Sequence, residues 1–158
     1  MRILVSLLLV LVMMLGMSGC GGKDAATEYE MSDIDAMVEA GAFSETLEEI
    51  DSETAFIMYD FAGHGIRQED IEDCKVLRSA GATCEEVAIL QLADGSEEVV
   101  PKVEEALKEY LDGQIASNKD YRPNDIPKLE DALVDSDDEG RVIMVVANNL
   151  KAAESACS

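Results

Sequence analysis

The chain opens with an apolar leader that ends in a cysteine. Arg2 is followed by residues 3–15, of which only Ser6 is polar, and then by small residues up to Cys20. A basic start, an apolar run of about 7–15 residues and small residues at the cleavage point define a secretory signal peptide. The run is shorter than the about 20 apolar residues that a membrane-spanning helix needs. The sequence therefore predicts that residues 1–19 are removed and that the remaining chain is exported.

The end of the leader, Met17-Ser18-Gly19-Cys20, resembles the lipobox of bacterial lipoproteins, although leucine is commoner than methionine at its first position. The resemblance implies a diacylglyceryl group on the sulfur of Cys20 and cleavage between Gly19 and Cys20. An ordinary secretory signal beside a cysteine is the alternative. Each buried methylene contributes about 0.8 kcal/mol, and two acyl chains hold a protein stably on a bilayer. We therefore expect Cys20 to anchor the protein in the cell membrane, on the extracytoplasmic face.

The composition of the exported part fits one acidic domain. Removal of 19 of the 158 residues leaves 139, which suits a single core. This part holds 11 basic and all 34 acidic residues, a formal charge of −23. Such a surface argues against nucleic-acid binding, which needs Lys and Arg at the phosphates. A solvated surface is the simplest interpretation, and cationic partners or loosely held divalent metal are the functional ones.

The order of local patterns predicts one α+β domain over residues 33–157, behind a small, polar, flexible tether at residues 20–32. Hydrophobic periodicity and capping residues predict helices at residues 33–40, 54–59, 96–118 and 149–156. Apolar runs bounded by turns predict strands at residues 74–80, 86–93, 129–135 and 142–147. Leu47 and Ile50 lie in a segment of undetermined type. We expect an antiparallel sheet of about four strands in ββαββα order, packed with helices and preceded by two short helices.

One predicted strand is apolar throughout. Residues 142–146 read Val-Ile-Met-Val-Val, without the polar alternation of a strand that has one wet face. Strands that are covered on both faces have this composition. We therefore expect this strand to lie in the centre of the sheet.

Several of these segments together resemble a known family. Residues 79–90 (SAGATCEEVAIL), the Tyr121-Arg122-Pro123 loop after a long helix, and the apolar strand that ends at Ala147 are similar to an uncharacterised lipoprotein family, domain of unknown function 4358, found in Gram-positive anaerobes. The resemblance covers about residues 33–154 and implies a membrane-tethered extracytoplasmic protein of a Gram-positive cell. The family has no established catalytic residues, so it supplies none here.

Three cysteines remain in the exported part beside Cys20. In the first predicted hairpin, Cys74 lies opposite a residue near 92 and Cys84 lies in the turn, which places a bridge between them out of reach. No CxxC motif or Cys/His metal spacing occurs. We expect Cys74, Cys84 and Cys157 to be free, partly buried thiols and not metal ligands.

Two further features suggest chemistry at first sight. His64, the one histidine, lies between two glycines and is expected on an exposed loop without a catalytic role. Residues 135–140 are acidic and partly match a calcium loop, but the ligand position twelve would be Val146. A hairpin turn explains them better, since Asp and Gly favour turns. No catalytic residue, metal site or cofactor is therefore assigned.

These features favour a binding or protein-interaction module of the cell envelope, with the lipid bilayer and an envelope protein as its partners. A carboxylate-dependent hydrolase or transferase is one alternative. A protein that binds divalent cations or cationic peptides through its acidic surface is the other.

Overall fold

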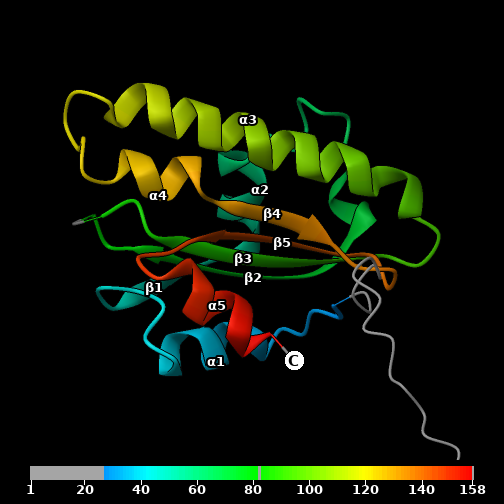
Figure 1. Ribbon diagram of the computed structural model, residues 1–158. Coiled ribbons are helices and arrows are strands. Elements are labelled where there is room, and N and C mark those ends of the chain that lie inside the picture. The colour runs from blue at the N-terminus through cyan, green and yellow to red at the C-terminus, as the bar shows by residue number, and fades with distance from the viewer. Residues whose placement is uncertain (1–26, 82, 158) are drawn as a thin grey trace, which may run out of the picture.

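The computed structural model describes residues 27–81 and 83–157 (Figure 1). The predicted signal peptide, Gly19 and Cys20 lie outside the described residues. The elements in chain order are α1 (Asp33–Glu39), β1 (Leu47–Ile50), α2 (Ser52–Met58), β2 (Ile71–Ser79), β3 (Glu86–Leu92), α3 (Val100–Asn118), α4 (Ile126–Glu130), β4 (Leu133–Ser136), β5 (Arg141–Val146) and α5 (Leu150–Ala156). Within the described ranges, no helix has the length and apolar character needed to cross a bilayer.

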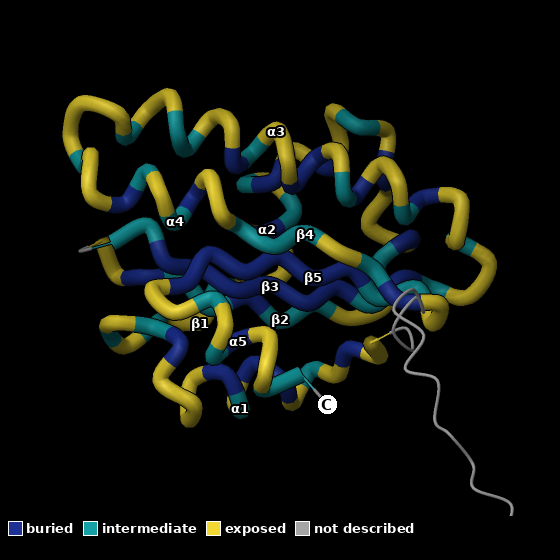
Figure 2. The backbone as a smooth tube through the Cα atoms, in the orientation of Figure 1, coloured by how far each residue is buried: buried dark blue, intermediate teal, exposed yellow. Residues whose placement is uncertain are grey.

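The five strands form one antiparallel sheet in the order β1-β2-β3-β5-β4. This confirms the predicted α+β class and adds a fifth strand, because the undetermined segment at residues 47–50 pairs with β2. β3 and β5 lie in the middle and are buried along nearly their whole length (Figure 2). The prediction of a central apolar strand at residues 142–146 is therefore confirmed.

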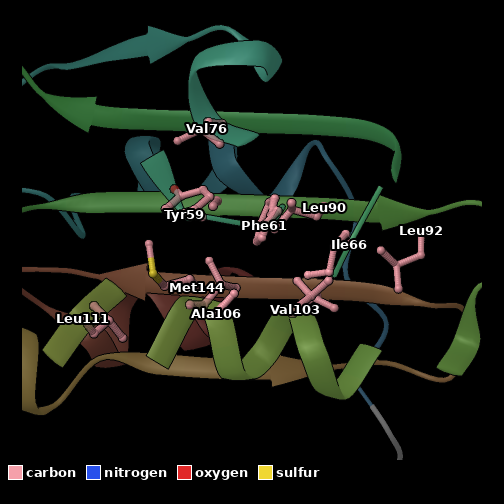
Figure 3. Close-up of a cluster of buried hydrophobic side chains, with 14 of the residues drawn as sticks. Tyr59, Phe61, Ile66, Val76, Leu90, Leu92, Val103, Ala106, Leu111 and Met144 are labelled. Carbon is pink, nitrogen blue, oxygen red and sulfur yellow. The ribbon is translucent and has the colours of Figure 1, made fainter. Parts of the chain in front are cut away.

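Helices cover both faces of the sheet. α3 and α4 lie over one face and α1 and α5 over the other (Figure 1), and α2 contributes Ala55 and Tyr59 to the core on the α3 side. Successive strand residues point to opposite faces, so β3 sends Leu90 into the α3-side core and Ile89 into the other. Figure 3 shows the α3-side core, with Tyr59 and Phe61 near Leu90 of β3 and with Val103, Ala106 and Leu111 on α3.

The predicted strand at residues 129–135 is partly wrong. Residues 126–130 form α4, and β4 covers only Leu133–Ser136. Pro127 occupies the first turn of α4, where the missing N–H costs nothing. Leu129, taken as a strand residue, is buried against the α3-side core from this helix.

The three cysteines are in the expected state, but the residue predicted to lie opposite Cys74 is wrong. Cys74, Cys84 and Cys157 are free and partly buried. Cys74 lies opposite Leu90 and not opposite a residue near 92. The loop between the two strands sets this register, because the Ser79 N–H donates to the Glu85 carbonyl oxygen (2.9 Å) and Arg78 lies opposite Glu86, which places Cys74 opposite Leu90.

The packed chain begins within the segment predicted to be a tether. Tyr29 is buried, its N–H donates to Asp137 Oδ2 (2.9 Å), and its hydroxyl donates to Asp135 Oδ2 (2.6 Å). Asp137 Oδ1 also accepts the N–H groups of Glu139 (3.0 Å) and Arg141 (2.8 Å), which closes the turn between β4 and β5. The acidic run is therefore a hairpin turn, as predicted, and it holds the start of the packed chain.

Replacement of Tyr29 by phenylalanine tests this attachment. We expect Tyr29→Phe to lower the free energy of unfolding by about 1 kcal/mol, because it removes one hydrogen bond to a carboxylate that is itself exposed. Urea denaturation measures the change. Tyr121→Phe is the matched control, since Tyr121 is 87% exposed and should change stability by less than about 0.5 kcal/mol. Equal stability of the two variants would contradict the attachment of Tyr29 to the β4–β5 turn.

Candidate functional site

A hollow of about 680 Å³ lies where β1 runs into α2 and where β2 begins. We call it the β2 groove. Its apolar part consists of Ile50, Phe56, Phe61, Ile71 and Cys74. Its acidic part consists of Glu49, Asp51, Glu53, Glu72 and Asp73, and Ser52 and Gln68 complete the lining. The groove thus combines an apolar surface with five carboxylates and contains no basic side chain.

The groove exists because β1 is shorter than β2. β1 ends at Ile50, which lies opposite Val76, so residues 71–75 of β2 have β3 on one side and no β1 partner on the other. The chain then turns into α2 at Asp51, whose carboxylate accepts the N–H (2.9 Å) and hydroxyl (2.7 Å) of Thr54. These bonds, the backbone one first, lower the pKa of Asp51. The helix cap therefore carries a negative charge at neutral pH.

The bulge at the start of β2 places two more acids beside the groove. Glu72 and Asp73 are exposed where the register shifts. The Cys74 N–H donates to Asp73 Oδ1 (2.8 Å). Bulges commonly end strand pairing and redirect side chains. The bulge thus contributes both to the open strand edge and to the acidic rim.

Cys74 does not act as a nucleophile in this environment. Burial raises the pKa of the Cys74 thiol to about 11, and the negative charge of Asp73 adds to the shift. A thiol reacts as its thiolate. Cys74 is therefore a neutral, apolar part of the lining at pH 7.

A buried carboxylate links two helices to the sheet beside the groove. Glu86 Oε1 accepts the hydroxyl of Tyr59 (2.6 Å), and Oε2 accepts the hydroxyl of Tyr110 (2.8 Å) and lies 3.2 Å from Arg78 Nε. Burial raises the pKa of Glu86, and the two tyrosine hydrogen bonds and Arg78 oppose the shift without cancelling it. None of these four residues lines the groove. The cluster therefore positions α2 and α3 on β3.

The neighbouring Glu85, just before β3, forms a separate set of buried contacts. Glu85 is completely buried; it accepts the N–H (2.7 Å) and hydroxyl (2.6 Å) of Ser44 and pairs with Lys128 Nζ (2.7 Å). Burial lowers the pKa of Lys128, but hydrogen bonds and charges from Glu85 and Asp125 outweigh it, so the pKa is raised overall. Glu85 thus joins α4 to the segment before β1.

Arg122 fastens the loop between β2 and β3. Its guanidinium donates to the carbonyl oxygen of Thr83 (2.9 Å) and to that of Gly81. Residues 79–90 and the Tyr121-Arg122-Pro123 loop, which carry the family resemblance, therefore meet in space. Their charged residues are occupied by contacts within the protein, which indicates a structural role for this motif.

The expectation of an exposed His64 is wrong. The His64 side chain is only 14% exposed, and its Nε2 lies 3.5 Å from Glu109 Oε2 on α3. No Ser, Thr or Cys side chain is hydrogen-bonded to the ring within the described ranges, so the structure brings no nucleophile to it. Across residues 27–81 and 83–157, no three His, Cys, Asp or Glu side chains are arranged to hold a metal ion.

Comparisons with known proteins give one match. A family model described as "Domain of unknown function (DUF4358)" matches residues 43–147. This range begins just before β1 and ends just after β5, so it includes the whole sheet, both buried glutamates and the β2 groove. No curated protein and no solved structure matches the chain.

Proposed function

The chain belongs to the DUF4358 family, and we propose that it is a lipid-anchored binding or protein-interaction module on the extracytoplasmic face of a cell membrane, which the family resemblance implies is that of a Gram-positive cell. The observation that carries the binding role is the β2 groove. Ligand sites are typically concave and largely apolar, with a few convergent polar groups. The β2 groove is concave and combines an apolar floor with five carboxylates, so it departs from this pattern by its acidity, and its one thiol is held neutral.

The proposed lipid anchor and the fold together support a short link between the membrane and the domain. The resemblance of residues 17–20 to a lipobox supports lipidation of Cys20, and Tyr29 is fixed to the β4–β5 turn. Eight residues separate Cys20 from Tyr29. Even fully extended, such a segment spans at most about 30 Å. An anchored domain would therefore meet partners within or close to the membrane surface.

Site-specific photo-crosslinking in cells tests the binding role. A photoreactive amino acid replaces Ser52 or Gln68, which line the groove, or Ser155 on α5 as the matched control. All three positions are exposed in the full chain. We expect one and the same partner, identified by mass spectrometry, from both groove positions and none from Ser155. Adducts that are identical at all three positions, or absent from both groove positions, would refute the role of the groove.

A further inference from the structure

We propose that the β2 groove receives an extended, basic peptide segment, which adds to the open edge of β2 as a further strand. This inference rests on the proposed binding role and specifies the chemistry of the partner.

The first argument is the open strand edge. Only residues 76–79 of β2 pair with β1, and residues 71–75 lack a partner on that side. An uncovered edge presents N–H and C=O groups to another strand, and addition of a peptide strand is a common form of recognition. The Cys74 N–H of this edge donates to Asp73 Oδ1 (2.8 Å), a bond that the incoming strand replaces. Five residues of an added strand span about 17 Å.

The second argument is the apolar surface beside that edge. Side chains of an added strand alternate between the two faces, so every second one would point toward the apolar lining, which includes the half-buried Ile50, Phe56 and Ile71. Ile57, which is 72% exposed, lies one helical turn from Glu53 on α2. The surface therefore favours apolar side chains at alternate positions of the peptide.

The third argument is charge complementarity. None of the five groove acids forms an ion pair within the described part of the chain. Their mutual repulsion is relieved by an incoming cation. A peptide spreads several Lys or Arg charges along the rim, whereas the acids are not gathered as a metal-ligand set. Complementarity of this kind also raises the rate of association.

The test measures binding of fluorescein-labelled (Lys-Val)₄ to the purified full chain in detergent by fluorescence anisotropy. Two control peptides have Glu in place of Lys, or Pro in place of the two central Val residues. Proline lacks the N–H that strand pairing needs. We expect saturable binding of the first peptide and binding at least about tenfold weaker for each control.

A pair of protein variants locates the site. Glu53→Gln/Glu72→Gln/Asp73→Asn removes three charges from the groove. The matched control, Glu105→Gln/Asp112→Asn/Asp120→Asn, removes three exposed charges on and just after α3. We expect the groove variant to bind (Lys-Val)₄ at least about fivefold more weakly than the control variant, with both variants keeping the circular dichroism spectrum of the parent.

Equal binding by the two variants would overturn the assignment to the groove. Equal binding of the proline peptide would overturn strand addition, and absence of binding would overturn the basic-peptide chemistry. If (Lys-Val)₄ does not bind while crosslinking from Ser52 and Gln68 still yields one partner, the inference of a basic peptide strand is refuted and the binding role of the groove stands. If neither the peptide binds nor crosslinking yields a partner, both the peptide inference and the binding role of the groove are refuted.

Discussion

Glu86→Ala is expected to lower the free energy of unfolding by about 3–5 kcal/mol, because it removes the carboxylate that three buried or half-buried donors share. The hydroxyls of Tyr59 and Tyr110 lose their acceptor in a place that water does not reach readily. Arg78 is half-exposed and can turn to solvent, so most of the loss comes from the tyrosines and from the cavity.

Urea denaturation measures this loss. Glu105→Ala is the control, since Glu105 is exposed on α3 and its replacement should cost less than about 0.5 kcal/mol. Tyr110→Phe should cost about 1.5–3 kcal/mol, less than Glu86→Ala, because only one hydrogen bond to a charged group is lost. A Glu86→Ala protein as stable as the parent would contradict the role of this cluster.

The same residue should give the protein a distinctive dependence on pH. The pKa of Glu86 is raised in the folded state, mainly by burial. Its stabilising contribution is therefore complete below the unfolded pKa of about 4.3 and is lost as pH rises through the folded pKa. The unfolding free energy of the parent minus that of Glu86→Gln should fall as pH rises from about 4. A difference that stays constant or rises would contradict the raised pKa.

Glu85→Ala, one residue before β3, is expected to cost a similar amount, about 3–5 kcal/mol. Lys128 would keep a mostly buried ammonium group with only Asp125 as a partner, at 3.3 Å, and Ser44 would lose the acceptor for both its N–H and its hydroxyl. Thermal and urea unfolding measure the loss.

A second substitution separates the charge from the serine contacts. Ser44→Ala removes only the hydroxyl donor and should cost about 1–2 kcal/mol. If Glu85→Ala were no more destabilising than Ser44→Ala, the pair with Lys128 would contribute nothing and the interpretation would fail.

Local patterns in the sequence predicted the helices and strands whose formation depends on neighbouring residues. Residues 142–146 are apolar throughout and form the buried strand β5. Asn149 caps α5, and its side chain accepts the N–H of Ala152 (3.2 Å). Where the deciding partner is distant, the patterns failed. β1 has two acids between Leu47 and Ile50, and only its pairing with residues 76–79 makes it a strand.

The β2 groove could not be predicted for the same reason. Its acids were visible as runs in the sequence, but the point where β1 stops on β2 is a long-range property of the register. Glu85 and Glu86 stand in the motif that carries the family resemblance, yet their partners lie up to 43 residues away. The turn of residues 135–140 was predictable, whereas its contact with Tyr29 was not, since the two are more than 100 residues apart.

The most direct test of a membrane-anchored module is the chemistry of residue 20. Cells that express the full chain are fed labelled palmitate, and the protein of the membrane fraction is analysed by intact-mass spectrometry beside Cys20→Ala. We predict a chain that begins at Cys20, carries diacylglyceryl and incorporates label, while Cys20→Ala carries none. Label that persists in Cys20→Ala, or that never enters the parent protein, would contradict the proposal.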